Sequence, residues 1–310
     1  METIKILFLA SHWRVSLIKA FQDAKQSMEL ICADSDPLAA SFKEANRFQV
    51  LPLFSDSNCL QSLLEICKAE KVSALVPLTN QAIEFIADHR HELELDGRRL
   101  WIPQNRAIDI CHDKWKLFKF LIDKGFDTPT TFFPGKLEFS FPLIAKPRRG
   151  EGSKDVFFLE NSDDLEFYMK KYPHHVFQKR VDGQEFSVDA YFDQQGSPRL
   201  IVPRERLEVR GGEVMVSRIN LNGGIIEKVT ALGAGLGLTG PCTIQGIQDD
   251  KFYFTDVNLR FGSGFVHTIS AGGNVPLMMY KELAGQELDS MKMDIKDHSV
   301  MTRYPESIFH

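Results

Sequence analysis

The segment FTDVNLRFGSG at residues 254–264 alternates polar and apolar side chains through its centre. In a strand, alternate side chains point to the same face, so an acid, an amide and a guanidinium would stand in one row. The row consists of Asp256, Asn258 and Arg260, and the opposite apolar face of Val257, Leu259 and Phe261. The alternative is a buried ion-pair network that closes the strand end, although burying such charges without a ligand costs on the order of several kcal/mol per ion before pairing. Motifs earlier in the sequence indicate the function of this row.

A second candidate site is the basic segment AKPRRGEGSK at residues 145–154. Its cations are Lys146, Arg148, Arg149 and Lys154, and its glycines are Gly150 and Gly152. Phosphates bind to backbone N–H groups that glycine leaves accessible and to nearby cations. The pattern G-x-x-x-x-G-K-[ST] does not occur in the chain, so this is not a Walker A loop. We expect a flexible loop that folds over a polyanion, with a solvated surface hairpin as the alternative.

Lys114 lies in the first turn of a predicted helix, a position that disfavours a cation. Asp113 can cap a helix that Gly125 ends and that Pro129 prevents from resuming. The apolar face expected for this helix consists of Trp115, Phe118, Leu121 and Ile122. In the first turn the macrodipole disfavours a cation by roughly 0.3–1 kcal/mol, a cost that a bound anion nearby would offset. The alternative is a free surface lysine that tolerates the small penalty.

The segment VFQKRVDGQEFSVDAYF at residues 176–192 is predicted to be a hairpin, with Asp182 and Gly183 at its turn. A strand edge leaves backbone N–H and C=O groups free to pair with a flat ring such as adenine. Glu185, seven residues after Gln178, could accept hydrogen bonds from ribose hydroxyls. Taken alone, the pattern fits an ordinary hairpin equally well.

Strand and helix patterns alternate through the first part of the chain. Apolar strands are expected at 4–10, 28–34 and 72–78, and amphipathic helices at 15–24, 58–70 and 80–90. This alternation predicts a parallel sheet covered on both faces. A dinucleotide-binding fold of this kind carries G-x-G-x-x-G after its first strand, whereas the turn here is SHWRVS, without glycine. We therefore expect no dinucleotide cofactor in this domain.

The remainder of the chain has a different pattern. Strands are expected at 141–147, 155–159, 174–181, 185–192, 199–203 and 243–257, and helices near 162–171, 227–235 and 275–284. This order predicts an α+β region with mostly antiparallel strands. The glycine-rich GAGLGLTG at 233–240 is interpreted as a helix end and a turn, and His267 as a structural residue.

Composition excludes several classes of protein. The chain has 310 residues, of which 43% are hydrophobic and 25% charged, with a net charge of −5. No basic excess favours binding to nucleic acid or to a membrane surface. The five cysteines are scattered, with no C-x-x-C pair, so reduced thiols are expected, neither a disulfide framework nor a zinc site. The N-terminus has too short an apolar run for a signal peptide, and the expected location is cytoplasmic.

Taken in order, the motifs resemble the ATP-grasp superfamily. They are Lys114 after HD, FPLIAKP, the RGEGS loop, VFQKRVDGQE, IQGI and TDVNLR. They are most similar to the synthetase halves of the carbamoyl phosphate synthase large subunit and to biotin carboxylase. No single motif is specific, but the ordered set is. The resemblance covers nearly the whole chain and implies an α/β N-terminal parallel-sheet (pre-ATP-grasp) domain followed by an α+β ATP-grasp fold. The expected limits are 1–105 and 106–310, with a small lobe at about 125–180 and a C-terminal lobe at about 181–310.

The resemblance also implies roles for individual residues. ATP phosphates would contact Lys114 and Lys146, beneath a loop that contains Gly150, Gly152 and Ser153. The adenine hinge would be Gln178, Lys179, Arg180 and Val181, and the ribose contact Glu185. Mg2+, with Mn2+ as an alternative, would be organised by Gln245, Asp256 and Asn258. Arg260 would hold the transferred phosphoryl group or the acyl phosphate, and Lys146 would be the second catalytic cation.

Two residues depart from the family's usual pattern. Gln178 stands where an acid is common, which leaves backbone pairing to adenine intact. Asp256 stands where glutamate is usual, and its shorter arm bears on whether one or two ions bind. The chain has one ATP-grasp unit and neither a glutaminase nor an allosteric region, so complete carbamoyl phosphate synthesis is not expected of it alone.

The expected function is that of an ATP-dependent ligase. A carboxylate would attack the γ-phosphate to give an acyl phosphate, and an amine or similar nitrogen nucleophile would then displace phosphate. The substrate carboxylate would be held by Arg204, Arg206 and Arg218, with Arg210 on the surface. The alternatives are an ATP-grasp phosphotransferase and a nucleotide-binding subunit that needs a partner chain. The expected partners are small-molecule carboxylate and amine substrates, with no nucleic acid and no membrane, and a homodimer is left open.

Overall fold

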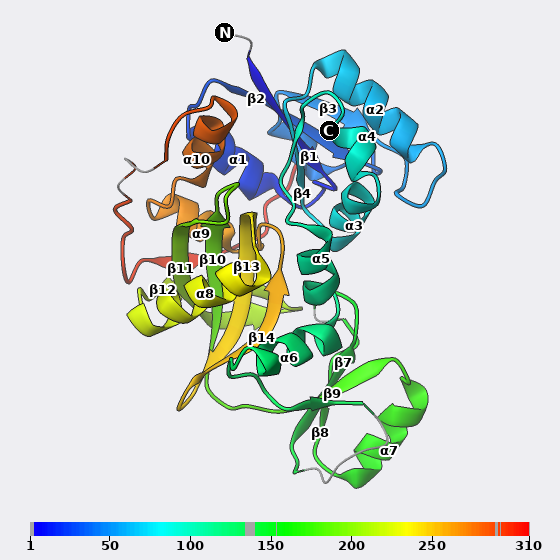
Figure 1. The fold of residues 1–310 in the computed structure, drawn as a ribbon, viewed down its shortest axis with the longest axis vertical. Coiled ribbons are helices and arrows are strands. Elements are labelled where there is room, and N and C mark those ends of the chain that lie inside the picture. Colours follow the sequence, from blue (N-terminus) through cyan, green and yellow to red (C-terminus); the bar gives the residue numbers. More distant parts are fainter. Residues whose placement is uncertain (1–2, 134–139, 153, 289–290, 292, 310) are drawn as a thin grey trace.

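The computed structural model describes residues 3–133, 140–152, 154–288, 291 and 293–309. Within these ranges the strands form three sheets, of five, six and four strands. Figure 1 shows them in succession along the long axis, with the N-terminal sheet at the top and the four-stranded sheet at the bottom. A parallel-sheet domain followed by mainly antiparallel sheets is the fold class that the sequence predicted.

The N-terminal sheet has the strand order β3-β2-β1-β4-β5, and all its pairings are parallel. Its strands are β1 (Ile4–Leu9), β2 (Met28–Asp34), β3 (Arg47–Val50), β4 (Ala74–Pro77) and β5 (Arg99–Leu100). The helices around it are α1 (Val15–Asp23), η1 (Ala40–Lys43), α2 (Cys59–Glu70), α3 (Asn80–Asp88), α4 (Arg90–Glu94) and α5 (Asn105–Cys111).

Strand β1 shows why helices cover both faces of this sheet. Its alternating side chains belong to two different cores: Ile6 packs in the core that contains Leu17 of α1, and Leu7 in the core that contains Leu63 of α2. All four of these residues are almost completely buried. Complete burial of an aliphatic side chain contributes about 1.5–3 kcal/mol, so a sheet with two apolar faces requires helices on both.

The six-stranded antiparallel sheet has the order β14-β13-β10-β11-β12-β15. Its strands are β10 (Gln184–Phe192), β11 (Pro198–Arg210), β12 (Glu213–Ile219), β13 (Gly240–Gln248), β14 (Phe252–Asn258) and β15 (Val300–Thr302). Its helices are α8 (Gly223–Leu236), α9 (Phe265–Ser270) and α10 (Val275–Leu283). The even-numbered residues of β10, such as Val188, share a core with Val229 of α8. The odd-numbered residues therefore point to the other face of the sheet.

Gly233 lets α8 approach this sheet closely. A Cβ atom at this position would lie 2.2 Å from the ring of Phe192, closer than any real contact. Helix α8 ends three residues later at Leu236, and Gly237 then adopts a left-handed φ of 67°, as a helix C-terminus favours. The segment GAGLGLTG is therefore a packing surface and a helix end, as the sequence predicted.

The four-stranded sheet has the order β6-β9-β7-β8. Its strands are β6 (Thr131–Phe132), β7 (Leu143–Pro147), β8 (Phe157–Leu159) and β9 (His175–Lys179), and helix α7 (Ser162–Lys171) lies with them at the bottom of Figure 1. A small core that includes Leu143, Leu165 and Phe177 holds this lobe together.

Helix α6 (Lys114–Asp123) begins as predicted, because the Asp113 side chain accepts hydrogen bonds from the backbone N–H groups of Trp115 and Lys116. The prediction of its buried face was wrong. The buried residues are Leu117, Phe120 and Leu121, whereas Ile122 is 56% exposed and Trp115 and Phe118 are only partly buried. The helix contacts β14 and β6, and these long-range contacts select a face one step away from the one that the pattern suggested.

None of the helices in the described part of the chain combines the length and the apolar composition needed to cross a membrane.

Candidate active site

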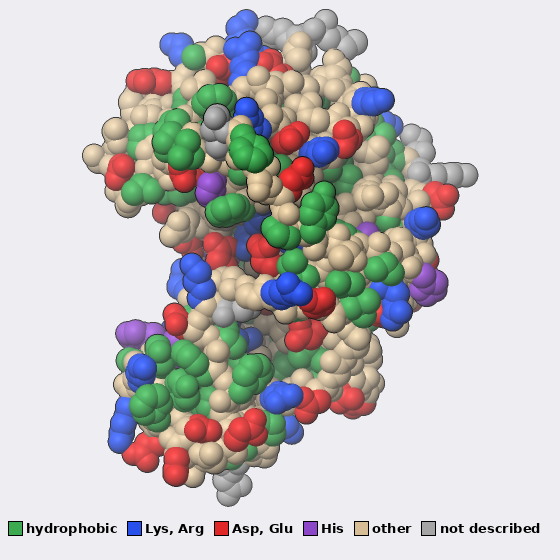
Figure 2. Space-filling model, turned by 180° about the vertical axis from the view of Figure 1, so that it is seen from behind, with side chains coloured by type: hydrophobic (Ala, Val, Ile, Leu, Met, Phe, Trp, Pro, Cys, Tyr) green, Lys and Arg blue, Asp and Glu red, His purple; other side chains and the backbone are tan. Residues whose placement is uncertain are grey.

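A cleft of about 410 Å3 lies between the four-stranded and six-stranded sheets. Figure 2 shows the hollow from behind, between the lower lobe and the rest of the molecule. The predicted residues on its walls are Lys114, Lys146, Gly150, Gly152, Gln178, Lys179, Val181, Glu185, Arg204, Arg206, Gln245, Asp256, Asn258 and Arg260. Arg180 and Arg218 do not line it, and Ser153 lies outside the described residues. Although the chain is acidic overall, lysine and arginine outnumber acids on the described walls, which favours an anionic ligand.

The strand row has the orientation that the sequence predicted. Asp256, Asn258 and Arg260 face the cleft, while Val257 and Leu259 are 1% and 2% exposed. Strand β13 supplies the neighbouring positions, because Gln245 pairs with Asp256 and Thr243 with Asn258. Two adjacent strands thus present one carboxylate and two amide side chains to the same space.

Lys146 is held in the cleft by Gln178. The Nζ of Lys146 donates to Oε1 of Gln178 at 2.9 Å, and Nε2 of Gln178 donates to the hydroxyl of Thr131 at 2.8 Å. Burial lowers the pKa of Lys146 to about 8, an effect that Asp256 opposes and Lys114 reinforces. The Gln178 amide therefore orients this lysine without neutralising its charge.

Lys114 reaches the glycine loop from the start of α6. Its Nζ donates to the backbone oxygen of Gly150 at 3.1 Å, and its backbone N–H donates to the backbone oxygen of Arg148 at 3.0 Å. Gly152 has a left-handed φ of 72°, a conformation that costs residues other than glycine energy. The lysine at the unfavourable end of the helix is thus joined to the loop.

Two cations of the basic segment do not point into the cleft. Arg148 forms two hydrogen bonds of 2.9 and 2.8 Å to the carboxylate of Asp113. Arg149 lies 3.5 Å from Glu84 and 3.8 Å from Asp109. The interpretation of this segment as one set of phosphate-binding cations is therefore wrong for the arginines, because acids of α3, α5 and the α6 cap neutralise them. Lys154, in contrast, does line the cleft.

The side chain of Arg260 contacts residues from two distant parts of the chain. Its Nη2 lies 2.5 Å from Oε2 of Glu151 in the glycine loop, and its Nε donates to Oδ1 of Asn80 at 3.3 Å. Arg14, which the sequence analysis did not select, also lines the cleft, and burial and then Arg260 lower its pKa to about 10. Arg14 follows the first strand, at the carboxyl end of the parallel sheet, where ligands commonly bind in α/β folds. Its position directly after β1 is the sequence feature that could have identified Arg14 as a site residue.

The predicted hinge at 178–181 uses two of its backbone donors internally. Lys179 donates to the backbone oxygen of Thr130 at 2.8 Å, and Arg180 to that of Pro142 at 3.1 Å. Within the ranges that the structure describes, the backbone N–H of Val181 has no acceptor. The Arg180 side chain pairs with Asp182 at 2.9 Å, so its contribution to a hinge would come from its backbone.

The arginines predicted to hold substrate differ in their surroundings. Arg204 is 1% exposed and donates to both oxygens of Asp189, at 2.7 and 3.0 Å. Arg218 donates to Glu205 at 2.8 and 2.5 Å and is absent from the cleft walls.

Arg206 lines the cleft, and its Nε lies 3.1 Å from Glu185, the predicted ribose contact. His267 is structural, as expected, since its ring nitrogens contact the hydroxyls of Ser217 and Ser299, and burial lowers its pKa to about 4. Of the arginines predicted for the substrate, Arg204 and Arg206 both line the cleft, and Nη1 of Arg204 has no hydrogen-bond partner among the described residues.

Two family models match the chain. Residues 111–264 match the model described as ATP-grasp domain, and residues 6–99 match the one described as PylC-like, N-terminal domain. The first match contains every predicted site residue from Lys114 to Arg260.

A carbamoyl-phosphate synthase from Methanobrevibacter smithii is 27% identical over 256 residues, which cover 80% of this chain and 63% of that protein. The chain therefore spans less than two thirds of this relative's length.

Solved structures with the same fold include an L-amino acid ligase from Bacillus licheniformis, with a TM-score of 0.74 and 19% identity over 94% of this chain and 78% of the other. A biotin carboxylase from Campylobacter jejuni has a TM-score of 0.71 at 18% identity, covering 97% and 75%. An N5-carboxyaminoimidazole synthetase from Staphylococcus aureus, complexed with ADP, has a TM-score of 0.76 at 15% identity, covering 97% and 82%. These solved structures show the fold, and the two family models show that this chain belongs to the ATP-grasp family, with a PylC-like N-terminal domain ahead of its ATP-grasp domain.

Proposed function

We propose that this protein is an ATP-dependent ligase that activates a carboxylate as an acyl phosphate and joins it to an amine or a similar nitrogen nucleophile. The observation that carries the proposal is the convergence of Lys146, Asp256 and Arg260 on one cleft, from two different sheets. A carboxylate oxygen would attack the γ-phosphorus while the bond to the β-phosphate oxygen breaks and ADP leaves. The nitrogen would then attack the acyl carbon as its free base and release phosphate.

This chemistry requires positioning and charge neutralisation more than a nucleophilic side chain. Lys114 and Lys146 would contact the nucleotide phosphates, and the loop around Gly150 and Gly152 would cover them. The N–H of Val181, which has no acceptor among the described residues, supports adenine binding at the 178–181 hinge, because a donor at a strand end can pair with a ring nitrogen.

The polar row fits a magnesium ion. Magnesium prefers hard oxygen ligands and is commonly bound through one or two carboxylates together with substrate phosphates. Asp256 supplies the carboxylate and Gln245 and Asn258 supply amide oxygens from adjoining positions of two strands. No group of three or more His, Cys, Asp or Glu side chains in the described ranges could hold an ion without such phosphates. Bound there, magnesium would neutralise charge on the phosphates.

Arg14 and Arg260 support a place for the substrate carboxylate at the N-terminal side of the cleft. They lie close enough for the charge of Arg260 to lower the pKa of Arg14, and two adjacent guanidinium groups attract an anion. Arg204 and Arg206 extend this positive surface along the cleft, and Nη1 of Arg204 has no hydrogen-bond partner among the described residues. We therefore assign the acid substrate to Arg14, Arg204, Arg206 and Arg260, and no longer to Arg218, which does not line the cleft.

The test is a phosphate-release assay with ATP and magnesium against pairs of small carboxylates and amines. We expect ADP and phosphate in equal amounts, and release that requires both the acid and the amine. Asp256→Asn should abolish this release. Asp250→Asn, at the β13–β14 turn of the same sheet, should not.

Two other outcomes would contradict the proposal. A stable phosphorylated product without free phosphate would identify a phosphotransferase. Tight nucleotide binding without turnover across the panel, restored by addition of another protein, would identify a subunit that needs a partner chain.

A further inference from the structure

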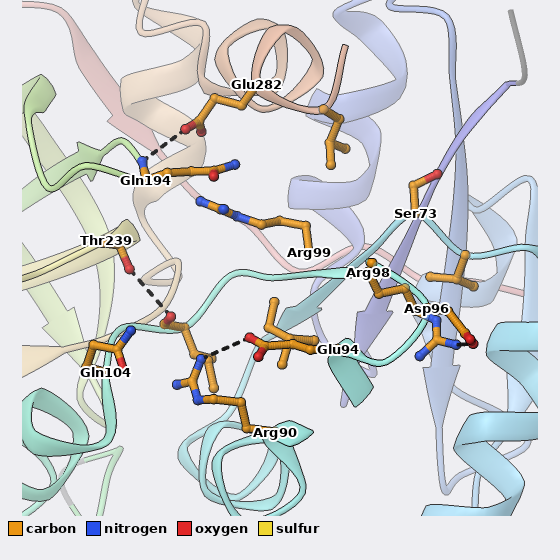
Figure 3. Close-up of a pocket in the computed structure, with 15 residues that line it drawn as sticks. Ser73, Arg90, Glu94, Asp96, Arg98, Arg99, Gln104, Gln194, Thr239 and Glu282 are labelled. Carbon is orange, nitrogen blue, oxygen red and sulfur yellow. Dashed lines mark hydrogen bonds and ion pairs between the residues drawn. The ribbon is translucent and has the colours of Figure 1, made fainter. Parts of the chain in front are cut away.

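A second cavity, of about 530 Å3, lies where the N-terminal sheet meets the C-terminal part of the chain. Its walls come from α4, from the amino ends of β4 and β5, from the β10–β11 turn and from α10. Figure 3 shows the polar side chains that these elements direct toward it. The cavity shares no lining residue with the nucleotide cleft, so the ligase chemistry leaves it unexplained.

Three arginines line this cavity, and two of them have partners. Arg98 donates to the backbone oxygen of Leu93 at 2.8 Å and pairs with Asp96. Arg90 donates to the backbone oxygen of Pro103 at 2.6 Å and contacts Glu94 at 3.4 Å. Both guanidinium groups therefore have structural roles in the walls.

Arg99 is different. Across the described ranges its side chain forms no hydrogen bond and no ion pair, and its Nε is buried. Figure 3 shows the side chain extended into the cavity toward Gln194, with no marked contact. Burial lowers the pKa of Arg99, although nearby Glu282 opposes this effect. Arg99 as a whole is only partly buried, but a cation whose Nε is buried without a partner is costly unless a ligand supplies one. The side chain faces the cavity, where such a ligand would lie.

Acidic side chains also line the cavity. Glu282 accepts hydrogen bonds from the hydroxyl of Tyr191 and, at 3.1 Å, from the backbone N–H of Gln194. Each carboxylate oxygen can accept more than one bond, so Glu282 keeps capacity for a further donor. Within the described residues, the side chain of Glu94 has the 3.4 Å contact to Arg90 and no shorter one. A simple anion on Arg99 would therefore lie among carboxylates, whereas a ligand with charges of both signs would satisfy both kinds of group.

The neutral lining suits a compact organic ligand. Gln104, Gln194, Ser73 and Thr239 offer further polar groups, and Leu100 and Leu283 offer apolar surface. The volume falls within the range of about 300–1,000 Å3 that is usual for small-molecule sites.

We propose that this cavity binds a small zwitterion, with its carboxylate on Arg99 and its ammonium group toward Glu94 and Glu282. An α-amino acid is the simplest ligand of that class. This site is separate from the cleft and requires neither nucleotide nor turnover.

The test is titration calorimetry on the full chain, without ATP or magnesium. The zwitterionic probes are glycine, L-alanine and L-glutamate. Acetate and inorganic phosphate test for an anion alone, and methylamine for a cation alone. We expect at least one amino acid to bind once per chain, and the single-charge probes to bind at least about tenfold more weakly. Binding of acetate or phosphate as tight as that of every amino acid, or no binding by any amino acid, would overturn the proposal.

Substitutions test whether the amino acid binds in this cavity. Arg99→Gln should weaken amino-acid binding at least about tenfold, while Arg210→Gln, which removes an exposed arginine paired with Glu208, should leave it unchanged. Asp256→Asn should also retain binding. Loss of binding in Asp256→Asn but not in Arg99→Gln would place the amino acid in the cleft and overturn the assignment.

The ligand-free melting temperature provides a separate readout. Arg99→Met removes a partly buried charge that has no partner among the described residues, so the variant should melt at or above the temperature of the unaltered protein. A fall of more than about 5 °C would mean that Arg99 stabilises the junction of the two parts by itself, and its role would then be structural.

Discussion

The guanidinium of Arg260 and the carboxylate of Glu151 lie 2.5 Å apart and join the end of β14 to the glycine loop. The loop's own acid thus occupies the group that we propose holds the phosphoryl group. Since both side chains are at most about a third exposed, the pair is only partly screened by solvent. Nucleotide phosphates and Glu151 should therefore compete for Arg260.

The first prediction concerns this competition. Glu151→Gln removes both the competitor and a negative charge from the cleft, so the Kd for ATP should fall about three- to tenfold, the equivalent of roughly 0.7–1.4 kcal/mol. Fluorescence titration at low ionic strength would measure the change. Glu166→Gln in α7, which removes an exposed acid paired with Lys170, is the control and should leave the Kd unaltered. A weaker affinity in Glu151→Gln would show that this acid takes part in nucleotide binding.

Lys146 should contribute to nucleotide affinity rather than to folding. Lys146→Ala removes a partly buried cation whose side-chain hydrogen bond, within the described residues, is to Gln178. ATP should therefore bind at least about tenfold more weakly, while the melting temperature changes by no more than about 2 °C. Unaltered ATP affinity in a folded variant would exclude Lys146 from the phosphate site.

The lowered pKa of Lys146 predicts a pH dependence of ATP binding. The amine is charged below about pH 8 and neutral above it in the free protein, and bound phosphates would raise its pKa. ATP binding should therefore take up a proton above pH 8, and the Kd should rise with pH in that range. Lys146→Arg keeps the charge at all these pH values and should flatten the profile. A flat profile in the unaltered protein would contradict the prediction.

Substitutions of Asp256 and Arg260 should reduce activity in different ways. Asp256→Asn keeps the shape but removes the charge, so turnover should fall at least about a hundredfold and recover partly at high magnesium. Arg260→Lys keeps the positive charge that attracts the nucleotide phosphates, so ATP affinity should change little. It loses the planar fork for an oxyanion, and the rate should fall because that oxyanion forms fully only when the phosphoryl group moves. Melting temperature measured beside turnover distinguishes this from a structural network. Such a network predicts early unfolding of both variants and normal activity in the folded fraction.

Arg14 should act on the acid substrate. Arg14→Gln should raise the KM for the carboxylate about tenfold or more and change the KM for ATP little, since uniform loss of a contact to one substrate raises its KM. Arg218→Gln removes an arginine that is paired with Glu205 outside the cleft and should change neither KM. Equal effects of the two variants would contradict the assignment of Arg14.

Local patterns in the sequence were enough to predict much of this molecule. The alternation around Asp256 determines which side chains face the cleft, and Asp113 determines where α6 begins. The first feature depends on the two-residue period of a strand, and the second depends on one helix cap. The parallel N-terminal sheet follows in the same way from the alternation of apolar strands and amphipathic helices.

Other features depend on contacts between distant segments. Asp189 on the adjacent strand binds two nitrogens of Arg204, and no local pattern shows that pairing. Arg148 and Asp113 are 35 residues apart, and Arg14 reaches the cleft only because the two parts of the chain meet there. Ion pairing between segments thus decided which cations are available to a ligand.

Strand β10 is hydrogen-bonded to β11 on one side and to β13 on the other along nearly its whole length. Its amide protons can therefore exchange with solvent only when the centre of the sheet opens, which makes the strand a reporter of the least frequent unfolding events. A ligand that binds only the folded chain lowers the population of such open states by mass action. Deuterium uptake in a peptide covering residues 184–192 would therefore measure the free energy of global opening, and its slowing by a ligand would give that ligand's binding energy without any assay of turnover.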